Sequence, residues 1–193
     1  MKAEVYKFFI TYKWYENKIW REVEVSNNYK LSKLAYLILA AFDTQANHLF
    51  FIKHNETQYE FEFDSEDESI ISPSEISLKS MNLECGSVLT MVYDFGCEHI
   101  FEITLTDISV MEKGASIKYP KITDGSGKGI LDNVFPDDFG EIIKEIDKTK
   151  KSEITYISPY GESEPWDYRD FDIDEMNRTL KRDIESVAAG FDE

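Results

Sequence analysis

The chain has 193 residues, of which 42% are hydrophobic, so it can bury one sizeable core. Its net charge of −17 repels nucleic-acid phosphates and anionic lipid surfaces, so direct nucleic-acid binding is not expected. Two cysteines are too few for a disulfide scaffold, and no apolar run reaches the roughly 18 residues of a membrane-spanning helix, so we expect a cytoplasmic protein.

The first fifty residues predict a hairpin and a helix. Residues 4–12 and 19–25 alternate apolar and polar side chains, and the connector "KWYEN" joins them as two antiparallel strands. Residues 31–42 then repeat apolar side chains at helical spacing. We expect this helix to pack on the sheet.

Four further strands are predicted over residues 48–54, 58–63, 88–93 and 100–108. The order strand, strand, helix, then strands predicts an α+β fold with a mixed, β-grasp-like (ubiquitin-like) sheet, a crossover helix and an added hairpin.

Residues 109–193 predict a loop-rich helical extension of this core, residues 1–108, within one domain spanning 1–193. Glycine and proline break the periodicity for about 25 residues after Ile108. Helical spacing returns over 135–148 and again after Asp172, which begins the last helix in a capping-box pattern with Glu175. Between them, Trp166 and Tyr168 are expected to be packing anchors.

Several motifs resemble the plasmid pRiA4b ORF-3-like family, whose members also occur as passenger proteins of insertion elements. They are "IWREVEV" before a helix, then "HLFFI", "VYDFG" and "YPKITDGSGKG", in the family's order and approximate spacing over about residues 3–183. The resemblance implies a fold but no particular activity. It also makes an association with plasmids or mobile elements an alternative.

The chain departs from the family pattern where that pattern is richest in polar side chains. After the Tyr-Asp-Phe-Gly turn the family continues with Asp, a Trp two residues later and a His after two more; this chain has Cys97, His99 and Phe101. The family's Cys-Pro-Pro-Glu-Asp stretch corresponds to "GILDN", which keeps only the acidic Asp132.

The turn Tyr93-Asp94-Phe95-Gly96 poses the question whether Asp94 acts in chemistry or in structure. A kinase would need a glycine-rich loop, a strand lysine and a His-Arg-Asp motif, which the sequence lacks. The favoured interpretation is structural: Asp94 accepts hydrogen bonds from nearby backbone N–H groups, and Gly96 supplies a positive φ.

A metal or phosphate site is not predicted. Cys97 and His99 could join Asp94 or His48 around zinc, but His99 shares strand parity with Phe101 and is expected to face the apolar side. The run "DGSGKG" lacks the phosphate-loop pattern and is interpreted as a surface loop. We therefore expect no cofactor and no metal.

Arg21 shares strand parity with apolar neighbours, so it is expected to be partly buried and to pair with a carboxylate, for which Asp94 is the predicted partner. Arg21, His48 and Asp94 are accordingly the predicted binding residues; none is assigned as catalytic.

Three classes of function follow. The sequence favours a non-catalytic protein-interaction or accessory module whose partner protein has a basic surface. The alternatives are a mobile-element or nucleic-acid-associated accessory protein and an enzyme with a cleft around Arg21, His48 and Asp94. No oligomeric state is predicted.

Overall fold

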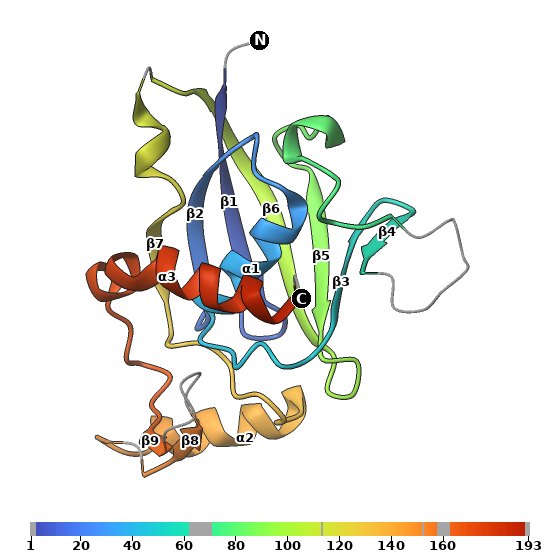
Figure 1. Ribbon diagram of the computed structural model, residues 1–193. Coiled ribbons are helices and arrows are strands. Elements are labelled where there is room, and N and C mark those ends of the chain that lie inside the picture. Colours follow the sequence, from blue (N-terminus) through green and yellow to red (C-terminus); the bar gives the residue numbers. More distant parts are fainter. Residues whose placement is uncertain (1–2, 62–70, 113, 152, 158–162, 192–193) are drawn as a thin grey trace.

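A sheet of seven strands forms the centre of the computed structural model, which describes residues 3–61, 71–112, 114–151, 153–157 and 163–191 (Figure 1). The strand order is β4-β3-β5-β6-β1-β2-β7. The strands are β1 (Glu4–Tyr12), β2 (Trp20–Ser26), β3 (Phe50–His54), β4 (Thr57–Glu60), β5 (Val88–Tyr93), β6 (His99–Val110) and β7 (Lys121–Ser126).

Two helices cover one face of this sheet. Figure 1 shows α3 (Ile173–Phe191) crossing α1 (Leu31–Ala41) in front of the central strands. The predicted helix 31–42 is confirmed, and it is buried well beyond its predicted stripe, since Tyr36, Leu37 and Leu39 are buried too. For Tyr36 the reason is α3, whose Phe191 stacks on this ring at 5.5 Å between ring centroids. The α+β class is therefore established.

The strand pairing differs from the mixed sheet that the sequence predicts, because every pairing between named strands of the described chain is antiparallel. The crossover helix α1 does join two strands of the same direction, β2 and β3. Three strands, β1, β6 and β5, lie between them. A mixed sheet needs two neighbouring strands that run in the same direction, and these two strands are not neighbours.

The predicted loop after Ile108 contains a strand. β7 pairs with β2 from Trp20–Ser126 to Glu24–Lys121 and adds an edge to the sheet, with Ile122 fully buried. The predicted strand 58–63 also differs, because β4 ends at Glu60; residues 62 and 63 lie outside the described residues.

Helix α2 (Pro136–Asp147) and the hairpin β8 (Thr155–Ile157)–β9 (Ser163–Pro165) lie together at one end of the sheet (Figure 1). Two short 3-10 helices, η1 (Leu78–Met81) and η2 (Ala115–Lys118), complete the elements. No helix in the described part of the chain is long and apolar enough to span a membrane.

Candidate functional site

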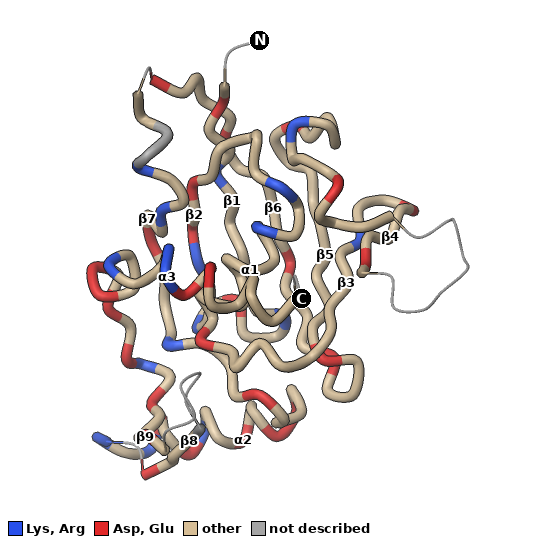
Figure 2. The backbone as a smooth tube through the Cα atoms, viewed as in Figure 1, with Lys and Arg blue, Asp and Glu red and all other residues tan. Residues whose placement is uncertain are grey.

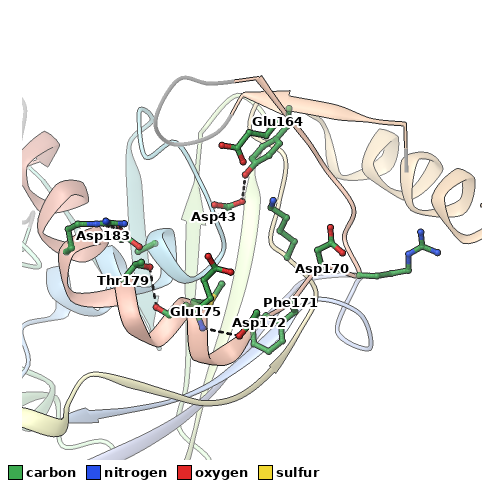
Figure 3. Close-up of a pocket in the computed structure, with 14 residues that line it drawn as sticks. Asp43, Glu164, Asp170, Phe171, Asp172, Glu175, Thr179 and Asp183 are labelled. Carbon is green, nitrogen blue, oxygen red and sulfur yellow. Dashed lines mark hydrogen bonds and ion pairs between the residues drawn. The ribbon is translucent and has the colours of Figure 1, made fainter. Parts of the chain in front are cut away.

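An open cavity of about 630 Å³ lies between α3, the segment that precedes it and the β8–β9 hairpin (Figure 3). Six of its lining side chains are carboxylates and three are cations. The carboxylates are Asp43, Glu164, Asp170, Asp172, Glu175 and Asp183, and the cations are Lys128, Arg169 and Arg182. Figure 3 shows these carboxylates distributed around the hollow, and the cavity is therefore acidic.

Asp43 reaches the cavity from the loop after α1, where its φ is 56°. Its Oδ2 accepts a hydrogen bond from the Tyr156 hydroxyl of β8 at 2.7 Å. Burial raises the pKa of Asp43, against the opposing effects of the Tyr156 hydrogen bond and the charge of Lys128. Asp43 is therefore a half-buried carboxylate whose charged form gains from a nearby cation.

The start of α3 supplies the opposite wall. Asp172 Oδ1 accepts hydrogen bonds from the backbone N–H groups of Asp174 and Glu175, both at 3.0 Å, so Asp172 is confirmed as the cap of α3. The return bond to the Glu175 side chain that completes a capping box is not among the hydrogen bonds of the described residues. This cap leaves the Glu175 side chain exposed, and Figure 3 shows it pointing toward the side of the hollow where Asp43 and Glu164 lie.

The cavity's cations already have anionic or aromatic neighbours. Arg169 contacts Asp167 at 2.5 Å, Arg182 contacts Asp183 at 3.0 Å, and Lys128 lies 4.8 Å from the centre of the Tyr156 ring. Within the described ranges no cation forms an ion pair with Asp170 or Glu175, both of which are exposed. The lining can therefore accept an incoming cation.

Arg21 does not pair with Asp94, and this prediction is wrong. The guanidinium is fully buried and donates to four backbone carbonyls, those of Trp20, Ala41, Ser126 and Lys128, at 2.7–3.0 Å. It stacks between Phe42 and Phe171, 5.0 and 4.4 Å from the ring centres. Burial lowers the pKa of Arg21 to about 9, so the group stays charged at neutral pH.

The physical reason is distance across the sheet. β2, which carries Arg21, is separated from β5 by β1 and β6. Carbonyl oxygens at the ends of α1 and β7 satisfy the guanidinium instead. The predicted cleft around Arg21, His48 and Asp94 is therefore not formed by these three residues together.

His48 and Asp94 do lie together. His48 Nε2 is 3.6 Å from Asp94 Oδ2 and 3.2 Å from Asn133 Oδ1. The His48 side chain is 32% exposed and that of Asp94 9%. The pair therefore forms a polar site at the surface end of β5.

Asp94 also builds the turn between β5 and β6, as predicted. Its Oδ1 accepts hydrogen bonds from the N–H groups of Gly96 at 2.9 Å and Cys97 at 3.4 Å. The positive φ lies at Asp94 (57°) and Glu98 (55°), so the prediction that Gly96 supplies it is wrong. Burial acts to raise the pKa of Asp94, but the N–H groups and His48 outweigh it and hold the pKa below its ordinary value.

Cys97 and His99 face the same carboxylate. One ligand atom from each of Asp94, Cys97 and His99 lies within 4.8 Å of the others. His99 is fully buried on the apolar side, as predicted, and its Nδ1 lies 3.0 Å from the Tyr12 hydroxyl. Burial lowers the pKa of His99 to about 4, and burial and then Asp94 raise the pKa of the Cys97 thiol.

Asp132 stands close to this cluster. Its Oδ2 accepts the backbone N–H of Gln45, while its buried Oδ1 has no hydrogen-bond partner among the described residues. Burial raises the pKa of Asp132 to about 6. Trp166 and Tyr168 are buried, which confirms them as packing anchors.

The acidic cavity was missed by the sequence analysis. Its carboxylates come from the loop after α1, from β9, from the segment before α3 and from α3 itself, and no single motif contains them all. Tyr156, which fixes Asp43, carries no motif either. Only the folded arrangement brings these segments together.

Comparison with known proteins gives a family and a fold. The family model described as plasmid pRiA4b ORF-3-like protein matches residues 4–178. The crystal structure of a protein of unknown function, MM3350 from Methanosarcina mazei Go1, is similar with a TM-score of 0.71 and 21% identity, covering 91% of this chain and 98% of that one. At this identity the likeness shows the fold alone. No curated protein matches the sequence.

Proposed function

Since the chain belongs to the plasmid pRiA4b ORF-3-like family, whose match carries no activity with it, we propose a function from its own surface: a protein-interaction module that binds a basic segment of a partner protein. The acidic cavity between α3 and the β8–β9 hairpin is the observation that carries this proposal. The net charge of −17 supports it, because such a charge steers a cationic partner toward the protein.

The cavity fits a lysine or arginine side chain. Asp170 and Glu175 are exposed on its rim, and the partly buried Asp43 lies deeper. A guanidinium or ammonium group entering between them would exchange water for charge-assisted hydrogen bonds, which are stronger than neutral ones. The partner's cation is thus recognised at both the rim and the interior.

A smaller cavity of about 180 Å³ adjoins the first and shares Ala40, Asp43 and Asp183 with it. Its other walls include Ala46 and Val187, which offer apolar contact. We therefore expect the partner segment to carry a basic residue followed by a small apolar residue. The basic side chain would enter the larger cavity, and the apolar side chain would enter the smaller one.

The lining suits the recognition of positive charge. Its six carboxylates outnumber its three cations, and each of those cations already contacts an anionic or aromatic neighbour. A nucleic-acid-associated role has less support, because Figure 2 shows Lys and Arg positions dispersed among acidic ones. A role beside plasmids or mobile elements would accordingly act through a protein partner.

The test is the binding of a fluorescein-labelled peptide of alternating Arg and Ala residues, measured by fluorescence anisotropy at physiological salt. The pocket variant is Asp170→Asn with Glu175→Gln, which leaves the Asp172 cap intact. We expect it to weaken binding at least about tenfold, because two charged contacts are lost.

The control is Glu102→Gln with Asp107→Asn, two exposed acids on β6 and the same change in charge. It should weaken binding less than about twofold, since only the general field changes. Equal weakening by both variants, or no binding by the unaltered protein, would refute the proposal.

A further inference from the structure

We propose that Asp94, Cys97 and His99 form a zinc site at the turn between β5 and β6, separate from the acidic cavity and independent of its function. The three side chains supply a carboxylate oxygen, a thiolate and an imidazole nitrogen, which are the donors that zinc takes in proteins. The sequence alone predicted no metal here, and the proposal rests instead on how the fold places these three donors.

The unpaired ring nitrogen of His99 points to a bound ligand. His99 is fully buried, yet its Nε2 has no hydrogen-bond partner among the described residues. Buried polar atoms are nearly always paired, because an unpaired one costs about 1–3 kcal/mol. A bound cation would satisfy this nitrogen.

Tyr12 contacts the other ring nitrogen of His99. Its hydroxyl lies 3.0 Å from His99 Nδ1. A metal-bound histidine usually engages an oxygen through its second nitrogen, which fixes the tautomer and the ring orientation. Tyr12 supplies this contact, and Nε2 is left as the nitrogen without a partner.

Asp94 can serve the turn and the ion together. Oδ1 accepts the N–H groups of Gly96 and Cys97, while Oδ2 faces His48 at 3.6 Å. The same turn fixes the position of Cys97, so that the loop presents two donors at a spacing of three residues. His48 is a positioning residue here, since it orients the Asp94 carboxylate.

The ligand atoms need only a small contraction. They lie within 4.8 Å of one another, whereas ligand atoms around a tetrahedral zinc lie about 3.3–3.8 Å apart, a value that follows from the usual zinc–ligand bond lengths. Side-chain rotations that move the ligand atoms by about 1 Å close this difference. Cys97 is half-buried and gives the ion a route from solvent, and three protein donors leave a fourth position for water.

The first test uses the unaltered protein and its two cysteines. After treatment with chelator, Cys97 and the exposed Cys85 are alkylated with iodoacetamide, with and without one equivalent of zinc. We expect zinc to slow the alkylation of Cys97 at least tenfold and to leave Cys85 unchanged, with one zinc retained per chain by elemental analysis. An unchanged rate at Cys97 would overturn the proposal.

The second test uses cobalt as a spectroscopic probe. Cys97→Ser should abolish the thiolate-to-cobalt absorption band, Cys85→Ser should keep it, and Asp94→Asn, which retains an oxygen for the turn, should weaken cobalt binding at least tenfold. His54→Ala, a change at the half-buried last residue of β3, is the histidine control and should bind cobalt normally. A band that persists in Cys97→Ser, or one lost in Cys85→Ser, would place the ion elsewhere and refute the assignment.

Discussion

Asp94 Oδ1 accepts the backbone N–H of Gly96 at 2.9 Å, and this bond closes the turn between β5 and β6 while Asp94 itself adopts a φ of 57°. Asp94 must therefore both adopt a left-handed backbone conformation and accept this hydrogen bond. Asparagine and aspartate tolerate this left-handed conformation better than other residues with a side-chain Cβ, and they can also accept the N–H bonds.

We predict that Asp94→Ala destabilises the chelator-treated protein by about 1–3 kcal/mol, because it removes the acceptor of two N–H groups and strains the backbone. The measurement is urea unfolding followed by circular dichroism. Asp94→Asn is the matched control and should cost less than about 1 kcal/mol. An Ala variant as stable as the parent protein would show that the turn does not depend on this carboxylate.

A second prediction concerns two glycines in different backbone states. Gly96 lacks a positive φ, and a Cβ there would lie 3.2 Å from Asp94 Oδ1, so Gly96→Ala should cost less than about 1 kcal/mol. Gly127 has a φ of 76°, and a Cβ there would collide with the Lys18 carbonyl oxygen. Gly127→Ala should therefore destabilise the fold by clearly more than about 1 kcal/mol, because alanine would have to adopt a positive φ and also collide with this oxygen. Thermal melts of the two variants compare them directly, and the reverse order would contradict the turn geometry.

The sequence predicted the regular elements of the sheet well because their side chains alternate. Phe8, Ile10 and Tyr12 repeat every second residue in β1, and all three are buried. β7 escaped detection because "KITDGS" contains one strongly apolar residue, Ile122, and two residues that disfavour strands. Pairing with β2, rather than local preference, makes it a strand.

The candidate sites were predicted less well, and Arg21 shows why. Strand parity indicated correctly that this side chain is buried, but its partners are carbonyls of Ala41, Ser126 and Lys128. Every residue carries such a carbonyl, so no residue-type pattern can mark them. His48 and Asp94 both belong to motifs that resemble the family, and they lie together in the fold. The acids around Asp43 belong to no such motif.

We predict that Arg21→Met destabilises the fold by about 3 kcal/mol or more, because it leaves several buried carbonyls without a donor and removes the packing between Phe42 and Phe171. Arg21→Lys should not restore stability, since an ammonium group cannot reproduce the planar fork. Arg178→Met, at an exposed position of α3, is the control and should stay within about 0.5 kcal/mol. Urea unfolding gives all three values, and a stable Met variant would disprove the bonding role of the guanidinium.

The last prediction concerns pH and Asp132. Its folded pKa is raised to about 6 from an ordinary value of 3.8, so the folded state holds this proton more tightly than the unfolded chain. The contribution to stability is therefore full below about pH 4 and is lost as pH rises through 6, with a total on the order of 3 kcal/mol.

Asp132→Asn removes this ionisation and keeps an oxygen for the Gln45 N–H. Relative to the parent protein, the variant should be more stable at pH 8 and show no such gain at pH 4. Urea unfolding at several pH values measures the difference, and Asp124→Asn, the same substitution at an exposed position of β7, serves as the matched control. The stability difference between the Asp132→Asn variant and the parent protein could instead be the same at every pH. The Asp132 carboxyl would then titrate normally, and burial at this site would not favour its protonated form.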